Sequence, residues 1–205
     1  MARFKQVRFF QTEAQGTLLL RIESFRREMI NIIYYKEGDL RIRPAVESDG
    51  EKLVEGFKEQ GWEKPLELFR TYHLQQSRAE IDFFVAECGQ IVAGYVVLIP
   101  ETPAGPFAAA KIPEIVDLNV LKSFQNHGVG SKLMDAAERK AEEMSDSVSL
   151  AAGLHFGYGT AQRMYVKRGY IPDGSGVWYR GRQLEQYGSC VNDDDLVLYL
   201  RKYFK

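Results

Sequence analysis

The sequence predicts a single α/β domain, in which helices pack on a mixed β-sheet. A chain of 205 residues is long enough to bury most of the surface that its unfolded state exposes. Hydrophobic residues make up 45% of the sequence, which is typical of a globular protein and argues against a disordered one. From residue 39 onward, short β-rich runs alternate with segments of helical periodicity, an order that is typical of mixed α/β folds.

The strands are predicted from alternating hydrophobicity or from runs of β-branched and aromatic residues. The first strand alternates, and the next two flank a turn that contains Gly89, which predicts a hairpin. A loop rich in Pro and Gly follows the hairpin at 101–111. The predicted strands are 40–45, 81–88, 91–100, 112–121, 147–154, 176–183 and 196–204.

The helices are predicted from their end signals and their apolar stripes. Ser48 and Asp49 form a typical N-cap signal, and Pro65 suits the first turn of the second helix. Gly169 predicts the end of the last helix. The predicted helices are 48–60, 65–76, 128–144 and 159–169.

Residues 1–37 are predicted to be an N-terminal extension, and residues 38–205 the α/β domain. Apolar residues recur at helical spacing within the extension, so an amphipathic helix is expected there. Such a helix would pack on the domain or on another subunit, which would make the protein a homodimer. The alternative is that translation starts at Met29 and that residues 1–28 lie upstream of the natural protein. The apolar positions are Leu18, Ile22, Phe25, Met29 and Ile32.

The composition excludes several classes of function. A net charge of −1 argues against a partner bound through phosphate neutralisation, so no nucleic-acid partner is expected. Cys88 and Cys190 lie far apart, fit a reducing compartment and show no metal-site spacing with the three histidines. No apolar run approaches the roughly 18 residues of a membrane-spanning helix, and the start lacks a secretory core. A cytoplasmic protein with no metal and no membrane partner is therefore expected.

A glycine turn is the most informative motif. Residues 128–131, with the sequence Gly-Val-Gly-Ser, lie between a predicted strand and a predicted helix. Unpaired N–H groups at a helix start favour anions, and glycines let a bulky anion approach the backbone. The turn is interpreted as a phosphate cradle or, alternatively, as a tight turn that binds nothing. A P-loop requires Lys before Ser or Thr, and here Lys132 follows Ser131, so a P-loop does not fit. A dinucleotide-binding fingerprint does not fit either, because Leu133 stands in place of its third glycine.

The segment DLNVLKSFQNHGVGSKLMDAAE, which starts at Asp117, resembles the acyl-CoA-binding motif of the GNAT superfamily of N-acetyltransferases. The opening LRIRPAVESD, from Leu40, and the late helix that ends in YVKRGY, from Tyr165, are also similar to family segments. The resemblance therefore runs from about Leu40 to the end. It implies a twisted mixed sheet, splayed beside residues 118–120, with helices on both faces. It also implies direct acetyl transfer from acetyl-CoA to a primary amine on a small molecule or peptide.

The same resemblance implies the residues that hold acetyl-CoA. Backbone amides of the glycine turn would bind the pyrophosphate, and the main chain of the preceding strand would pair with the pantetheine arm. His127 stands where the family usually has Arg or Lys, which removes a charge and leaves the backbone cradle. The pyrophosphate residues are Gln125, Asn126, His127, Gly128, Val129, Gly130 and Ser131, and the pantetheine residues are Leu118, Asn119 and Val120.

Two carboxylates are candidates for work on the amine, which must lose a proton before it attacks. By strand alternation, Glu114 shares a face with Val116, Leu118 and Val120, and desolvation there would raise its pKa and make it a better base. Family members that carry a glutamate base have it in a similar segment. The alternative is that Glu114 faces solvent.

Asp117 falls on the opposite face of an ideal strand, with Ile115 and Asn119, unless a β-bulge re-aims it. The resemblance implies that such a bulge is common here. Asp117 would then bind the acceptor ammonium or replace Glu114 as the base. Alternatively, it is a hydrogen-bonded strand residue without a catalytic role.

The resemblance also assigns Tyr165 as the residue that protonates the departing thiolate, the alternative being a core tyrosine with one hydrogen bond. Tyr158 stands where the family often has Asn, which puts a pantetheine contact in question. Two rival functions remain open: a non-catalytic acyl-CoA-binding module, and an acetyltransferase for charged tRNA. The near-neutral charge speaks against the second rival.

Overall fold

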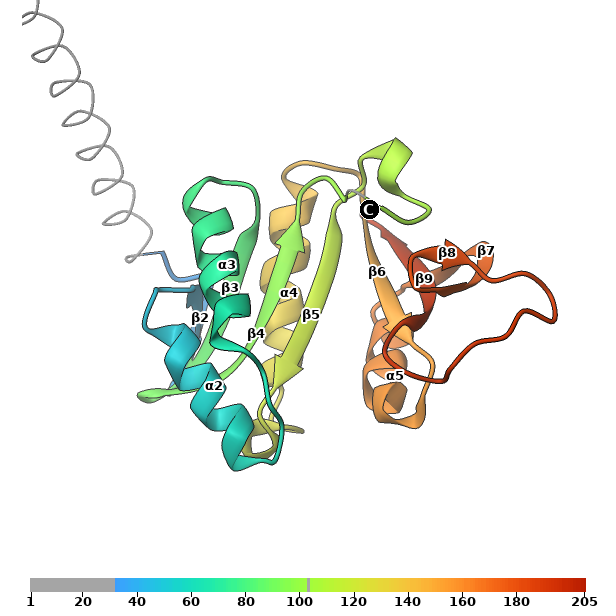
Figure 1. Cartoon of the computed structure of the whole chain (residues 1–205). Helices are drawn as coiled ribbons and strands as arrows, with labels where there is room; N and C mark the ends of the chain where they lie inside the picture. Colours follow the sequence, from blue (N-terminus) through green and yellow to red (C-terminus); the bar gives the residue numbers. More distant parts are fainter. Residues whose placement is uncertain (1–31, 103) are drawn as a thin grey trace, which may run out of the picture.

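The computed structural model describes residues 32–102 and 104–205 (Figure 1). These residues form one sheet of nine strands, in the order β1-β2-β3-β4-β5-β6-β9-β7-β8. The strands are β1 (Tyr35–Glu37), β2 (Leu40–Pro44), β3 (Asp82–Cys88), β4 (Ile91–Ile99), β5 (Glu114–Val120), β6 (Ser147–Gly153), β7 (Ile171–Tyr179), β8 (Arg182–Gln183) and β9 (Leu196–Tyr203). The α-helices are α2 (Asp49–Glu59), α3 (Leu66–Ser77), α4 (Val129–Glu142) and α5 (Gly159–Lys167).

The predicted mixed α/β fold is confirmed, with differences at the ends of elements. β1 pairs with β2, so the sheet begins at Tyr35, before the predicted domain boundary at residue 38. Ser48 does not cap α2 with its side chain; the carboxylate of Asp49 instead accepts a hydrogen bond from the backbone N–H of Val46. The helical stripe expected from Leu18 to Met29 lies outside the described residues.

Helices cover both faces of the sheet (Figure 1). On β3, Phe83 and Val85 pack with the core under α2 and α3, whereas Phe84 and Ala86 pack with the core under α4. A strand buried on both faces is mostly apolar, which explains the continuous hydrophobic runs at 83–86 in β3 and 91–99 in β4. Tyr165 of α5 belongs to the α4 core, so α4 and α5 share one face and α2 and α3 share the other.

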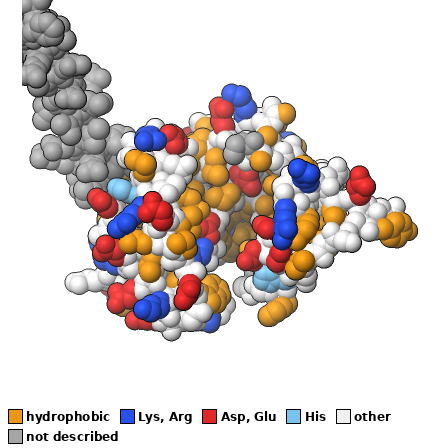
Figure 2. All heavy atoms as spheres, in the orientation of Figure 1, with side chains coloured by type: hydrophobic (Ala, Val, Ile, Leu, Met, Phe, Trp, Pro, Cys, Tyr) orange, Lys and Arg blue, Asp and Glu red, His pale blue; other side chains and the backbone are white. Residues whose placement is uncertain are grey.

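The sheet is splayed between β5 and β6, as the family resemblance implies. These two strands are parallel and pair only through Glu114 with Ser149 and Ile115 with Leu150. Beyond Ile115 they separate, so the edge of β5 from Val116 to Val120 has no strand partner on the β6 side among the described residues. Figure 1 shows the two strands diverging, and Figure 2 shows a hollow between the two halves of the molecule whose floor carries hydrophobic side chains.

A β-bulge lies in β5 at the splay. Tyr95 of β4 pairs with Asn119 and Val97 pairs with Val116, so β5 has one residue more than β4 over this stretch. Asp117 is in the left-handed region at φ 51°, which is uncommon for a residue other than glycine. The extra residue reverses the strand's alternation from this point onward.

Candidate active site

The glycine turn sets the start of α4. Gly128 is the N-cap at φ 83°, a conformation that glycine adopts without steric cost. Asn126 precedes it at φ 64°, and the Gln125 side chain donates a hydrogen bond to the carbonyl of Val120, which ties the turn to the end of β5. Because the turn is held by these contacts, its shape does not depend on a ligand.

The backbone N–H groups of this turn are free to bind. Within the described part of the chain, the N–H groups of residues 126–131 make no bond to a backbone carbonyl. A Cβ placed on Gly128 would meet no atom within 4 Å, so the molecule leaves open space on that side of the turn. At the N-terminus of a 14-residue helix, such donors and the helix dipole together favour a phosphate group.

The unpaired edge of β5 leads from the splay to this turn. Asn119 and Val120 pair with β4 on one side only, Leu118 lies within the bulge, and the turn follows within a few residues. Leu118 and Val120 pack toward α4, on the side that carries Tyr165. Their backbone offers hydrogen-bonding groups in extended conformation to an extended ligand, as a sheet edge offers them to an added strand.

Asp117 is the centre of a polar cluster on the opposite face, toward α2 and α3. Its Oδ1 accepts hydrogen bonds from Lys64 Nζ at 2.7 Å and from Asn119 Nδ2 at 2.8 Å. Its Oδ2 accepts from the hydroxyls of Tyr95 at 2.6 Å and Tyr72 at 3.2 Å. The carboxylate therefore binds an ammonium group in this structure, beside the open edge of the strand.

The bulge corrects the predicted faces of β5. The prediction that Glu114 shares a face with Leu118 and Val120 is wrong, because these two residues pack in the α4 core. Val116 does lie on the Glu114 side, in the core under α2 and α3. Asp117, expected opposite Glu114 on an ideal strand, is turned to the same side by the bulge. Both carboxylates consequently face the α2 and α3 side of the sheet.

Glu114 is buried at the closed end of the splay, with 7% of its surface exposed. The hydroxyl of Thr102 donates a hydrogen bond to its Oε2. Burial raises the pKa of Glu114 above the 4.5 of a free glutamate, and the Thr102 hydrogen bond lowers it in part. The alternative of a solvent-facing Glu114 is therefore wrong, and the carboxyl group has the desolvated environment that favours a base near neutral pH.

Tyr165 is also buried, at 7% exposure, and lies in the α4 core with its ring 6.0 Å from that of Tyr170. Among the described residues, its hydroxyl has no hydrogen-bond partner. Burial, and next the neighbouring Tyr158, raise the pKa of Tyr165 to about 12. Tyr158 lies against Gly153 at the end of β6, and burial followed by the charges of Asp194 and Asp117 raises its pKa to about 12.

A family model described as the acetyltransferase (GNAT) family matches residues 50–170, which include the bulge, both carboxylates and the glycine turn. This chain belongs to the GNAT family of acetyltransferases. No curated protein matches the sequence. Solved GNAT structures share the fold at low sequence identity, so the likeness does not identify the acceptor of this acetyltransferase.

Three solved structures illustrate this likeness. A ribosomal-protein-alanine N-acetyltransferase from Brucella melitensis is 19% identical, with a TM-score of 0.59 over 80% of this chain and 99% of that one. The Salmonella typhimurium enzyme that modifies the N-terminal serine of ribosomal protein L7/L12 is 14% identical, with a TM-score of 0.62 over 85% and 100%. Salmonella typhimurium yncA, solved with its cofactor acetyl-CoA, is 13% identical, with a TM-score of 0.59 over 80% and 94%.

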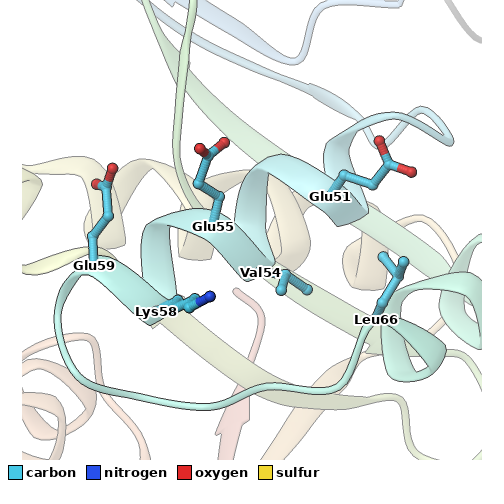
Figure 3. Close-up of a pocket in the computed structure, with 6 residues that line it drawn as sticks. All are labelled: Glu51, Val54, Glu55, Lys58, Glu59 and Leu66. Carbon is cyan, nitrogen blue, oxygen red and sulfur yellow. The ribbon is translucent and has the colours of Figure 1, made fainter.

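One depression on this GNAT acetyltransferase lies away from the splay. It has a volume of about 620 Å³ and opens on the outer surface of α2. In Figure 3, Glu51, Glu55 and Glu59 stand in a row along α2, while Lys58 and Val54 point to the other side of the depression. None of its lining residues belongs to the glycine turn or the Asp117 cluster, so we assign it no part in acetyl transfer.

Several site residues carry no signal in the sequence. Lys64 is in the loop between α2 and α3, and Tyr95 is inside a hydrophobic run, so nothing marks either as a partner of Asp117. Thr102 comes from the loop after β4. Within residues 32–102 and 104–205, no group of metal-binding side chains occurs and no helix is long and apolar enough to cross a membrane.

Proposed function

We propose that this GNAT acetyltransferase transfers the acetyl group of acetyl-CoA directly to a primary amine. One observation carries the proposal: the open edge of β5 runs from an ammonium-binding carboxylate to an empty row of backbone N–H donors. These are the two ends of a transfer site for a phosphate-bearing acyl donor and an amine. The non-catalytic alternative would use only the second of them.

Acetyl-CoA would bind along the splay. Its pyrophosphate would accept hydrogen bonds from the N–H groups of residues 126–131, and its pantetheine arm would pair with the main chain of Leu118, Asn119 and Val120. The thioester would then lie beside the bulge, where a main-chain N–H of the unpaired edge would stabilise the oxyanion. A donor of this type is worth roughly 10²–10³ in rate.

Asp117 would bind the acceptor as an ammonium ion. A hydrogen bond to a charged partner contributes about 1.5–3 kcal/mol, so this carboxylate can select protonated amines from solution. Its remaining partners, Tyr72, Tyr95 and Asn119, all donate to the carboxylate oxygens and hold them in place. The acceptor would enter from the α2 and α3 side, opposite the side that carries Tyr165.

Glu114 would take the proton that the ammonium must lose. Asp117 lies three residues further along the strand, roughly 10 Å at the usual rise per residue, so the proton would pass through water. The amine nitrogen then attacks the thioester carbonyl carbon, the carbon–sulfur bond breaks, and CoA leaves as the thiolate. The nitrogen loses its second proton to water and becomes the amide.

Tyr165 would donate a hydrogen bond to the departing sulfur. With a pKa of about 12, its hydroxyl keeps its proton at any working pH. Complete transfer to a thiolate, whose thiol has a pKa of about 8.5, is uphill by roughly 5 kcal/mol. The role that fits is therefore stabilisation of the thiolate until water protonates it.

The proposal is tested by CoA release. The protein is incubated with acetyl-CoA and a panel of amines, and free thiol is measured; acetyl-CoA binding is measured separately by calorimetry. Because two similar enzymes act on ribosomal-protein alanine and on an N-terminal serine, peptides that begin with these residues belong in the panel beside small amines. Binding with no CoA release for any amine would contradict catalysis and favour the non-catalytic module.

A further inference from the structure

The ammonium group that Asp117 binds belongs to the chain itself. Lys64 lies just before Pro65 in the loop that joins α2 to α3, and its side chain is 21% exposed. Its Nζ donates hydrogen bonds of 2.7 Å to both Asp117 Oδ1 and the Tyr95 hydroxyl. It also lies 5.3 Å from the centre of the Tyr95 ring and 5.5 Å from that of Phe57.

These contacts are those of an amine-binding subsite. A carboxylate, a hydroxyl acceptor and two aromatic faces are the groups that recognise a primary ammonium ion. Lys64 comes from a loop on the acceptor side, and its four-carbon stem ends at Asp117, which lies on the open edge of β5. Because the side chain already lies there, no loop has to move for the amine to reach this position.

We propose that Lys64 is a self-acetylation site, at which this enzyme transfers an acetyl group to its own Nζ. The inference rests on the proposed function, since it uses the same acyl donor and the same subsite. It assigns the first acceptor of the site as an internal lysine. Proximity is the driving factor, because an amine held at the reacting edge needs no encounter with a second molecule.

The step balances without a further reagent. The Lys64 ammonium gives up one proton, through Asp117 or water, and the free Nζ attacks the thioester carbonyl carbon. A nitrogen–carbon bond forms, the carbon–sulfur bond breaks, and the nitrogen loses its second proton to solvent. The products are Nζ-acetyllysine and CoA with its thiol reprotonated.

The product no longer fits the subsite that made it. An acetylated Nζ carries no charge and cannot form an ion pair with Asp117. Acetylation would therefore free the Asp117 carboxylate for an external amine. Self-acetylation would then act as a priming reaction that precedes turnover on other acceptors.

Background chemistry predicts a different pattern. Uncatalysed acetylation by acetyl-CoA favours exposed lysines, and Lys58 on α2 is exposed whereas Lys64 is mostly covered. Lys58 is in the same part of the chain, six residues earlier, and makes no contact with Asp117 in the described structure. It is therefore the matched internal control for Lys64.

The experiment uses the full chain and acetyl-CoA with a deuterated acetyl group, so that acetylation acquired during expression is distinguished by mass. Peptide mapping measures label at Lys64 and Lys58 over time. We expect label at Lys64 to form faster than at Lys58 by about tenfold or more, at a rate per molecule that is independent of protein concentration. The Gly128→Glu variant should lose the Lys64 label and keep the Lys58 background.

Two further measurements make the result decisive. Lys64 can also be acetylated during expression, which leaves an unlabelled acetyl group. An unlabelled acetyl group at Lys64 in the wild type that is absent from Gly128→Glu supports the proposal equally. Calorimetry and the amine panel separate the two proposals. If acetyl-CoA binds and external amines are acetylated while Lys64 reacts no faster than Lys58, self-acetylation alone is overturned. If acetyl-CoA does not bind, the proposed function fails with it.

Discussion

The hydroxyl of Tyr95 on β4 and the carboxylate of Asp117 on β5 are joined by a 2.6 Å hydrogen bond across the bulge. Burial, followed by the charge of Asp117, raises the pKa of Tyr95, so the phenol remains a donor to this carboxylate. The pair fixes the orientation of the one carboxylate that binds an ammonium ion at the open edge of the sheet.

Asp117→Asn should weaken acceptor binding more than it slows the chemical step. The amide keeps the size of the side chain and loses the negative charge, so KM for an amine should rise by about 10–100-fold, from the loss of a charged hydrogen bond. Steady-state kinetics with a fixed amine measures the split between KM and kcat. A kcat loss with unchanged KM would instead make Asp117 the base.

Glu114→Gln should lower kcat/KM at pH 7 by about 10²–10⁴ and recover at high pH, where the amine is already neutral. The wild-type rate should fall with decreasing pH as the carboxylate is protonated, in a window above the 4.5 of a free glutamate because burial raises the pKa of Glu114. In Glu114→Gln this limb should be absent. A loss of rate that high pH does not restore would argue against a base.

Glu114→Gln should lower the rate at neutral pH but raise the stability of the fold. A group whose pKa is raised on folding stabilises the protein below its unfolded pKa, and this contribution is lost as pH rises through the folded pKa. At neutral pH, Glu114 is therefore a buried charge that costs stability. We expect Glu114→Gln to melt at a higher temperature than the wild type at pH 7–8 and with a smaller difference near pH 4. The Gln side chain can still accept the Thr102 hydrogen bond.

Gly128 and Gly130 should respond differently to alanine. Gly128→Ala places a side chain at φ 83°, which costs roughly 1–2 kcal/mol of stability. A Cβ at Gly130 meets only Val120 Cγ2 at 3.5 Å, so Gly130→Ala should fold normally and lower acetyl-CoA affinity only if the ligand approaches the backbone there. Calorimetry and thermal melts measure both effects.

Gly128→Glu should abolish acetyl-CoA binding, and unchanged affinity would mean that the turn binds nothing.

Tyr165→Phe should slow acetyl transfer with little change in melting temperature. The hydroxyl has no hydrogen-bond partner among the described residues, so its removal costs the fold no contact there. The measurement is a single-turnover rate at saturating acetyl-CoA, because product release can mask the chemical step in kcat. Tyr158→Phe, at the N-terminal end of the same helix, is the matched control. A wild-type single-turnover rate in Tyr165→Phe would exclude its role at the sulfur.

The sequence predicts the elements well because each carries its own periodicity. The glycine turn is predicted in place, since a strand, a turn and an apolar helical stripe follow one another within 31 residues, from 114 to 144. The last position of that stripe, Met144, lies beyond α4 and is 43% exposed, as expected of a fraying end. Local patterns therefore identify the fold and the position of the glycine turn.

The acceptor side could not be predicted in the same way. Strand alternation assumes one residue per position, and the extra residue at Asp117 puts Leu118 and Val120 on the face opposite to the expected one. The residue pattern of EIVDLNV does not indicate the bulge, because the bulge depends on pairing with β4; the family resemblance alone implies one here. Lys64 is 53 residues away from Asp117 in the chain, so only the tertiary structure brings them together.

The two halves of the sheet are held together along β5 and β6 by only two residue pairs. A ligand that bonds along the open edge binds only the folded protein. Its binding free energy would therefore increase the free energy of unfolding of the whole domain. Resistance to heat or proteolysis would then rise with the concentration of acetyl-CoA. The lifetime of this protein in a cell would then depend on the concentration of acetyl-CoA. A fall in acetyl-CoA would lower the amount of folded enzyme.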